Sequence, residues 1–116
     1  IIYSPENFDP KKSELFASQI DLFPSLVELL KLEGKYSAIG KNFFENEPDF
    51  AVVKDGALLE IFSKEGFLVH SLKKILDFQP VDAFSDELIK SKLASKVVAF
   101  DHLTYTLLNQ NRWLSP

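Results

Sequence analysis

The sequence has no cysteine and no methionine, and it has only four glycines and one tryptophan in 116 residues. Without cysteine there can be no disulfide framework, thiolate nucleophile or cysteine zinc site. The lack of cysteine is compatible with a reducing compartment, so we expect an intracellular protein. Because the chain starts at Ile1 and has no methionine, we expect a processed product or a fragment of a longer chain. A subunit of a larger assembly is the other expectation for this domain.

Long apolar runs are also missing. No run approaches the roughly 20 residues that span a bilayer. The first ten residues, IIYSPENFDP, lack a basic region followed by an apolar core. We therefore expect neither a membrane span nor a signal peptide.

Positive charge is scarce, and arginine is almost absent. Thirteen basic residues stand against seventeen acidic ones, which gives a net charge of −4, and Arg112 is the only arginine. Affinity for nucleic acid comes mainly from basic side chains that neutralise phosphates, and the arginine fork suits phosphates and guanine edges. A nucleic-acid partner is therefore not expected.

The residues that are present are typical of a folded domain. Hydrophobic residues make up 46% of the chain and charged residues 26%, close to ordinary globular usage. A chain of this length buries roughly two thirds of the surface that its unfolded form exposes. We predict one domain over residues 1–116, with no linker inside it.

The first predicted helix covers about residues 10–22. Asp9 and Pro10 form a helix-start pair, a cap followed by a first-turn proline. Apolar residues follow at helical spacing as far as Phe23. The residue before a proline avoids helical geometry, so this helix should end at Phe23.

A second helix is predicted over residues 24–34, bent away from the first. Pro24 fits its first turn, and Gly34 should end it in the left-handed conformation. Its apolar face between Leu26 and Leu32 is wide, which predicts a position at the centre of the core. The following stretch, 35–48, stays open between a short helix and a loop.

A β-hairpin is predicted over residues 50–63. FAVVK and ALLEIFS flank Asp55-Gly56, and this dipeptide favours a two-residue hairpin turn. In residues 67–78, apolar side chains at helical spacing favour a helix over a third strand.

The last part of the chain has no glycine or proline between Pro80 and Pro116. Ser85, followed by two acidic residues, is a typical helix N-cap, and an apolar stripe continues to Leu107. Residues 96–100 also have strand propensity, so helix, strand, helix is the alternative. We expect mostly helix here. The predicted fold class is α+β, with several helices packed on a small antiparallel sheet built around the 50–63 hairpin.

The stretch PDFAVVKDGALLEIFSK resembles the core of the PD-(D/E)xK nuclease family. Pro48 and Asp49 match the first half of its motif and Glu60 matches the acid, and the resemblance implies that the two acids bind a divalent metal. The family has lysine two residues after the acid, where this chain has Phe62. Its lysine is Lys64, which lies about 13 Å from Glu60 along a strand at roughly 3.3 Å per residue. The resemblance therefore implies a degenerate relative.

Other catalytic patterns are weaker. His70 and His102 could form a site with Asp77 or Asp82, but the two histidines have no metal-ligand spacing. No phosphate loop, nucleophile elbow or HExxH motif is present. We therefore predict no cofactor and no catalytic residues.

Phenylalanine is abundant, with eleven copies. Phe43, Phe44, Arg112 and Trp113 lie near breakers or the chain end, and arginine and tryptophan are enriched in interface hot spots. These four residues are the predicted interface. The predicted function is a non-enzymatic protein–protein interaction domain that binds another protein chain. The alternatives are the degenerate nuclease, with Asp49 and Glu60, and a small-ligand domain with an aromatic pocket.

Overall fold

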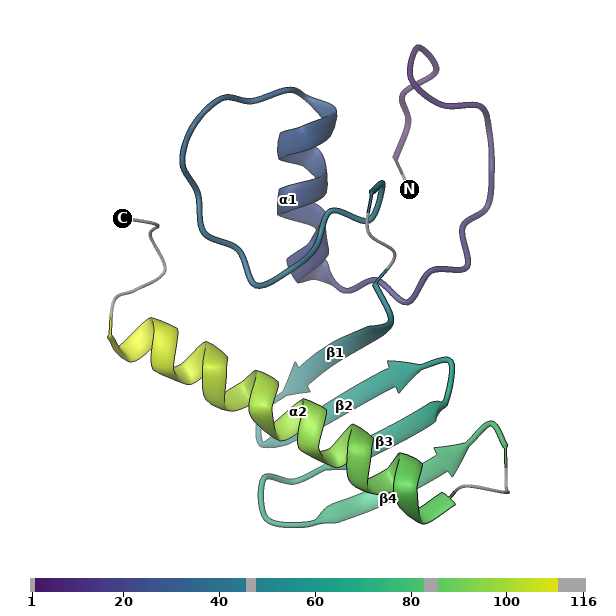
Figure 1. The fold of residues 1–116 in the computed structure, drawn as a ribbon, viewed down its shortest axis with the longest axis vertical. Coiled ribbons are helices and arrows are strands. Elements are labelled where there is room, and N and C mark those ends of the chain that lie inside the picture. The colour runs from purple at the N-terminus through teal and green to yellow at the C-terminus, as the bar shows by residue number, and fades with distance from the viewer. Residues whose placement is uncertain (1, 46–47, 83–85, 111–116) are drawn as a thin grey trace.

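The computed structural model describes residues 2–45, 48–82 and 86–110 and shows an α+β fold (Figure 1). Two helices and one four-stranded sheet make up its regular structure, so the prediction of several helices was too high for these residues. In chain order the elements are α1 (Gln19–Leu29), β1 (Phe50–Asp55), β2 (Leu58–Ser63), β3 (Gly66–His70), β4 (Ile75–Pro80) and α2 (Asp86–Asn109).

The sheet is an antiparallel meander in which every strand pairs with its neighbour in sequence. The strand order is β1-β2-β3-β4. β1 and β2 occupy the residues of the expected hairpin, with Asp55 opposite Leu58 and Gly56 at φ 57° in the turn. Positive φ at this turn position is the conformation that glycine adopts without steric cost.

The prediction of a helix over residues 67–78 is wrong, because β3 and β4 occupy this stretch. Leu68 and His70 both point to the buried side of the sheet, whereas Val69 between them is only half-buried. The chain then turns back through Leu72, whose φ is 68°, and the Ser71 amide donates to the Lys74 carbonyl oxygen at 2.9 Å. The apolar spacing fits a helix, but pairing of β3 with both β2 and β4 overrides it.

The C-terminal helix is confirmed. α2 is continuous for 24 residues, and residues 96–100 lie within it rather than in a strand. The predicted cap at Ser85 lies outside the described residues. α2 crosses one face of the sheet (Figure 1). There Leu93 and Val97, both at 0% exposure, form the core with the buried residues Leu59, Ile61 and Leu68.

The first helix starts later than predicted, and Pro24 does not divide it. Residues 10–18 form no helix, and Ser18 rather than Asp9 is the N-cap, with its amide donating to Asp21 Oδ2 at 2.9 Å. Pro24 lies inside α1, where it removes the amide that would bond to the Ile20 carbonyl. Gly40 packs against this carbonyl so closely that a Cβ on Gly40 would lie 2.0 Å from its oxygen.

The end of α1 is also earlier than predicted, and the helix is not central. The Leu32 amide donates to Val27 O and the Lys31 amide to Glu28 O, both at 3.0 Å, while Lys31 has φ 49°. These bonds form a Schellman motif three residues before Gly34. Leu30 is 61% exposed and Leu32 58% exposed, so α1 does not form the centre of the core.

The N-terminal half lies beside the sheet rather than on it (Figure 1). The Cα radius of gyration is 16.2 Å, whereas a compact domain of this length has about 13 Å. The buried hydrophobic residues of the described chain all fall between Ala51 and Val97. One face of the sheet is covered by α2, and no described helix lies over the other (Figure 1).

Candidate interaction surface

The second face of the sheet carries the side chains that alternate with the core positions. Successive residues of a strand point to opposite faces, so the strand register assigns every side chain to one side. Leu59, Ile61 and Leu68 point to α2. The opposite side, here called the open face, is made by Ala51, Val53, Asp55, Leu58, Glu60, Phe62, Phe67, Val69, Asp77 and Gln79.

The central part of the open face is mostly apolar, with Glu60 between its apolar side chains. Val53 is 46% exposed, Leu58, Phe62, Phe67 and Val69 are half-buried, and Phe16 of the N-terminal coil lies beside Phe62 and Phe67. The rings of Phe62 and Phe67 face each other across β2 and β3, with centroids 4.7 Å apart. Outward positions of a solvated antiparallel sheet are normally polar. These apolar side chains therefore form a patch that a further layer could cover.

The charges on the open face are all negative. Asp55, Glu60 and Asp77 lie on it by register. The strands contain one lysine, Lys54, and its ammonium lies on the α2 side, bonded to Asp101. The open face thus combines an apolar centre with carboxylates and has no lysine from the strands.

The two acids of the nuclease motif are not brought together. Glu60 pairs with Val53, four residues along β1 from Asp49, which corresponds to about 13 Å at 3.3 Å per residue. Asp49 Oδ2 instead accepts a hydrogen bond from Lys96 Nζ at 3.1 Å, and Lys41 Nζ lies 3.7 Å from Oδ1. The bond from Lys96 holds the pKa of the Asp49 carboxyl below its usual range, against an opposing effect of burial.

The histidines do not meet either. His70 is buried, and its Nδ1 accepts the Leu72 amide at 3.0 Å, which fixes the turn after β3. His102 is exposed on α2, and Asp77 points from the open face. Residues 2–45, 48–82 and 86–110 contain no group of three or more histidine, aspartate and glutamate side chains that could hold a metal ion.

The predicted aromatic interface is only partly described. Phe44 is 40% exposed, its ring stacks on Phe8 at 4.9 Å, and Phe43 lies 4.7 Å from Phe44. The two rings therefore hold the N-terminal coil against the segment that leads into β1. Arg112 and Trp113 lie outside the described residues.

A buried polar link between α1 and that segment was missed by the sequence analysis. Asp21 Oδ1 accepts the Lys41 amide at 2.8 Å. Ser25 Oγ donates to the Asp21 carbonyl oxygen at 2.6 Å and accepts the Phe43 amide at 3.0 Å. An acidic residue three positions after Ser18 is a capping-box signal, so Asp21 could have been found as a helix-start residue. Its bond to Lys41, twenty residues away, could not.

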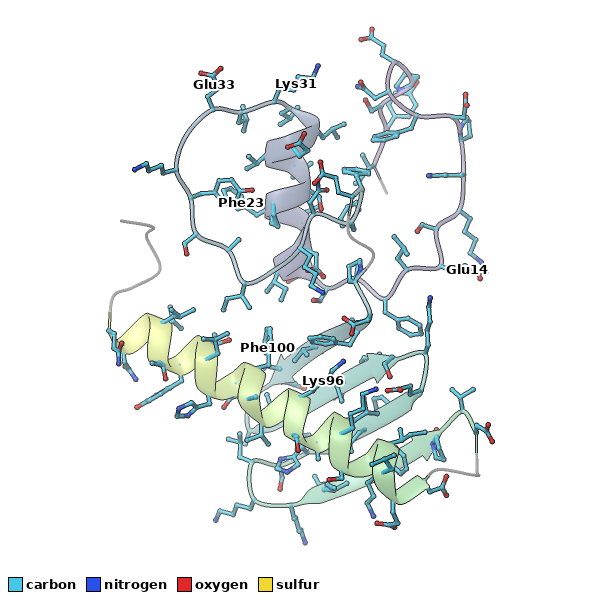
Figure 2. All side chains as sticks on the ribbon, viewed as in Figure 1. Glu14, Phe23, Lys31, Glu33, Lys96 and Phe100 are labelled. Carbon is cyan, nitrogen blue, oxygen red and sulfur yellow. The ribbon has the colours of Figure 1, made fainter. Side chains whose placement is uncertain are left out.

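A half-open cavity of about 300 Å³ lies between the start of α1, the segment before β1 and the second half of α2. Lys41 and Lys96 lie at this cavity together with Asp49, and Figure 2 shows Lys96 and Phe100 projecting from α2 on this side. Its apolar lining includes Ile20, Ile39, Phe50, Phe100 and Leu103.

Comparison with known proteins gives no relative, since neither a protein-family model nor a curated protein nor a solved structure matches the chain. Within the described ranges, neither helix has the length and apolar character needed to cross a membrane. The function must therefore be inferred from the surfaces of the chain itself.

Proposed function

We propose that this chain is a non-enzymatic interaction module that binds another protein chain through the open face. The observation that carries the proposal is the apolar centre of that face. Val53, Leu58, Phe62, Phe67 and Val69 occupy adjacent outward positions on three paired strands. A cluster of apolar side chains that solvent can still reach, such as exposed Val53 with its half-buried neighbours, supports an interaction role for this face.

The test changes one exposed apolar residue on the open face and one elsewhere. Val53→Lys places a charge on the open face, and Val98→Lys places the same charge on α2, at 46% and 40% exposure respectively. Tagged wild-type chain and both variants would be used to capture partners from the native source, after circular dichroism has shown equal folding. We expect a stoichiometric partner to be lost with Val53→Lys and kept with Val98→Lys. Equal capture by all three chains would contradict the proposal.

The cavity supports a second candidate function, the binding of a small, largely apolar molecule that carries one negative charge. Two ammonium groups that share the single carboxylate of Asp49 leave one positive charge in excess of that carboxylate beside an apolar lining, which fits a molecule that has one acidic group. The dye 8-anilinonaphthalene-1-sulfonate is a suitable probe. Lys96→Gln should weaken its binding, whereas Lys92→Gln, on the same helix and paired with Glu65 instead, should not. Equal dye binding by both variants would exclude the site.

A further inference from the structure

We infer that the open face binds a basic amphipathic helix of the partner chain. This inference rests on the proposed function and deepens it by naming the chemistry of the partner. The first support is charge. Glu60 lies in the middle of the face, paired with Val53 on one side and Val69 on the other. Among the described residues, neither Glu60 nor Asp55 forms an ion pair.

The acidic side chains surround or interrupt apolar ones, so the partner must offer both kinds of contact. Asp55 lies at the turn end of β1, and Asp77 lies on the edge strand β4, where its Oδ2 accepts only the neighbouring Gln79 amide in the described contacts. A partner with lysine or arginine beside an apolar stripe would pair with these carboxylates. Complementary charge of this kind fixes orientation and speeds association more than it adds affinity.

The dimensions of the face fit one helix. Its strands have five or six residues, which is about 17–20 Å, and four strands spaced by about 4.8 Å span roughly 14 Å. An α-helix with its side chains is about 10–12 Å wide, and 17–20 Å corresponds to three to four turns. One helix of that length would cover the apolar centre.

The opposite face already shows this arrangement. α2 packs Leu93 and Val97 on the core, while two of its lysines reach acids at the margins of the sheet, one in the β2–β3 turn and one just before β1. Lys92 Nζ lies 2.7 Å from Glu65 Oε1, and Lys96 Nζ lies 3.1 Å from Asp49 Oδ2. The sheet therefore already packs against one lysine-flanked helix, with the acids that pair to it at the sheet's margins, whereas the open face carries its acids on the strands themselves.

A second copy of this chain is a poorer occupant. In a symmetric dimer through the open face, each copy would bring the same three carboxylates, Asp55, Glu60 and Asp77, to the interface. Like charges brought together in an interface cost free energy. The buried apolar residues of α2, Leu93 and Val97, are not available to a second copy, because they pack in their own core.

The experiment uses the full chain and two synthetic helical peptides of eighteen residues. Both peptides carry leucines at positions i, i+4, i+7 and i+11; one has lysines beside the stripe and the other has glutamates in the same places. Binding would be measured by fluorescence anisotropy at two salt concentrations. We expect the lysine peptide to bind at least about tenfold more tightly than the glutamate peptide, and less tightly at high salt.

Two double variants remove equal charge from different surfaces. Glu60→Gln with Asp77→Asn neutralises the open face while keeping side-chain size. Glu14→Gln with Glu33→Gln gives the same net charge, but Figure 2 shows both of these residues on the N-terminal half rather than on the strands. The first pair of substitutions should lower the affinity for the lysine peptide by about three- to tenfold, since exposed ion pairs contribute modestly to binding. The second pair should change its affinity by less than about twofold.

Each result decides the question. Equal binding of both peptides, or equal loss in both double variants, overturns the inference. If the chain self-associates and Glu60→Gln with Asp77→Asn strengthens the dimer, the occupant is a second copy and the inference fails. If neither peptide binds while a partner sensitive to Val53→Lys is still captured, the proposed function stands and only the partner chemistry is wrong. If neither peptide binds and no partner sensitive to Val53→Lys is captured, both the proposed function and the inferred partner chemistry are wrong.

Discussion

Two small polar residues connect α1 to the segment that leads into β1. Asp21 is 4% exposed and Ser25 0% exposed, and both bond to amides of the segment that leads into β1. In the described residues no buried side-chain oxygen or nitrogen lacks a partner. Removing one member of such a link leaves a desolvated group on the other side, which is the costly part of losing a buried hydrogen bond.

Ser25→Ala should therefore lower the free energy of unfolding. The change removes the acceptor of the part-buried Phe43 amide, and we expect a loss of about 1–3 kcal/mol in a urea titration. Ser95→Ala, on the exposed side of α2, is the matched control and should change stability by less than about 0.5 kcal/mol. A Ser25→Ala variant as stable as this control would show that the link contributes nothing.

The Asp49 ion pair predicts a small effect that depends on pH. The hydrogen bond from Lys96 lowers the folded-state pKa of Asp49. The ion pair therefore adds its full contribution to the free energy of unfolding above the ordinary aspartate pKa, and this contribution disappears as pH falls through the lowered value. Because the side chain is 61% exposed, Asp49→Asn should cost less than about 1 kcal/mol at pH 7. Denaturation from pH 7 to pH 2 should show this difference shrinking only below about pH 4.

Asp9→Asn serves as the control for that titration, since Asp9 is exposed in the N-terminal coil. Its stability difference from the wild type should stay near zero at every pH. A difference for Asp49→Asn that grows on acidification would have the wrong sign and would contradict the assignment of Lys96 as the main cause.

At the scale of elements, the sequence predicted the first two strands of the sheet and missed the other two. The turn at Gly56 has a steric signature, and so it could be read directly. The turn at Leu72 has none, because leucine is not a residue that favours positive φ. With no visible breaker between Leu68 and Leu76, helical spacing was the stronger pattern, and β3 and β4 were missed.

Leu72→Gly should stabilise the protein. Leucine in the left-handed region is strained by roughly 1–2 kcal/mol, and the side chain is 47% exposed, so little packing is lost. Allowing for the greater freedom of glycine in the unfolded chain, we expect a gain of up to about 1 kcal/mol by thermal denaturation. Leu76→Gly, in β4 at 50% exposure, should instead destabilise. A loss in both variants would mean that Leu72 contributes more by packing than it costs by strain.

The helix near the N-terminus shows the same limit of local signals. Asp9 and Pro24 are residues that typically mark the start or end of a helix. In the structure, however, Ser18 caps α1 and Pro24 lies within it. The helix tolerates the proline because only one backbone bond is lost, at Ile20 O, and Gly40 occupies the space against that carbonyl. Gly40 lies twenty positions after Ile20 in the chain. A local reading of the sequence around Pro24 therefore could not reveal this contact.

At the scale of the whole molecule, the open face could not be derived from sequence without the full strand register. Phe62 and Glu60 were placed on strand positions, but their neighbours Phe67 and Asp77 belonged to a predicted helix. The apolar and acidic residues therefore could not be assembled into one surface. The predicted interface relied on Phe43 and Phe44 instead, whose positions near chain breakers are a local feature.

The distribution of buried residues predicts that the C-terminal part folds alone. The buried hydrophobic residues of the described chain lie between Ala51 and Val97, whereas α1 and its coils contribute none. A chain of residues 48–116 should give a cooperative thermal transition and a sheet-plus-helix circular dichroism spectrum. The complementary chain, residues 1–47, should be unfolded at the same temperature. Loss of cooperativity in 48–116 would show that the N-terminal half is part of the core.

The meander order of the sheet also bears on how fast the protein folds. Strands that follow chain order make contacts between residues close in sequence, and topologies rich in such contacts fold quickly because each closing loop is short. After dilution from denaturant, the sheet and α2 should form first. The bonds of Asp21 to Lys41 and of Ser25 to Phe43, which close loops of about twenty residues between segments of coil and helix, should form in a later phase. A newly made chain would thus acquire its open face before α1 is bonded to the segment that precedes β1.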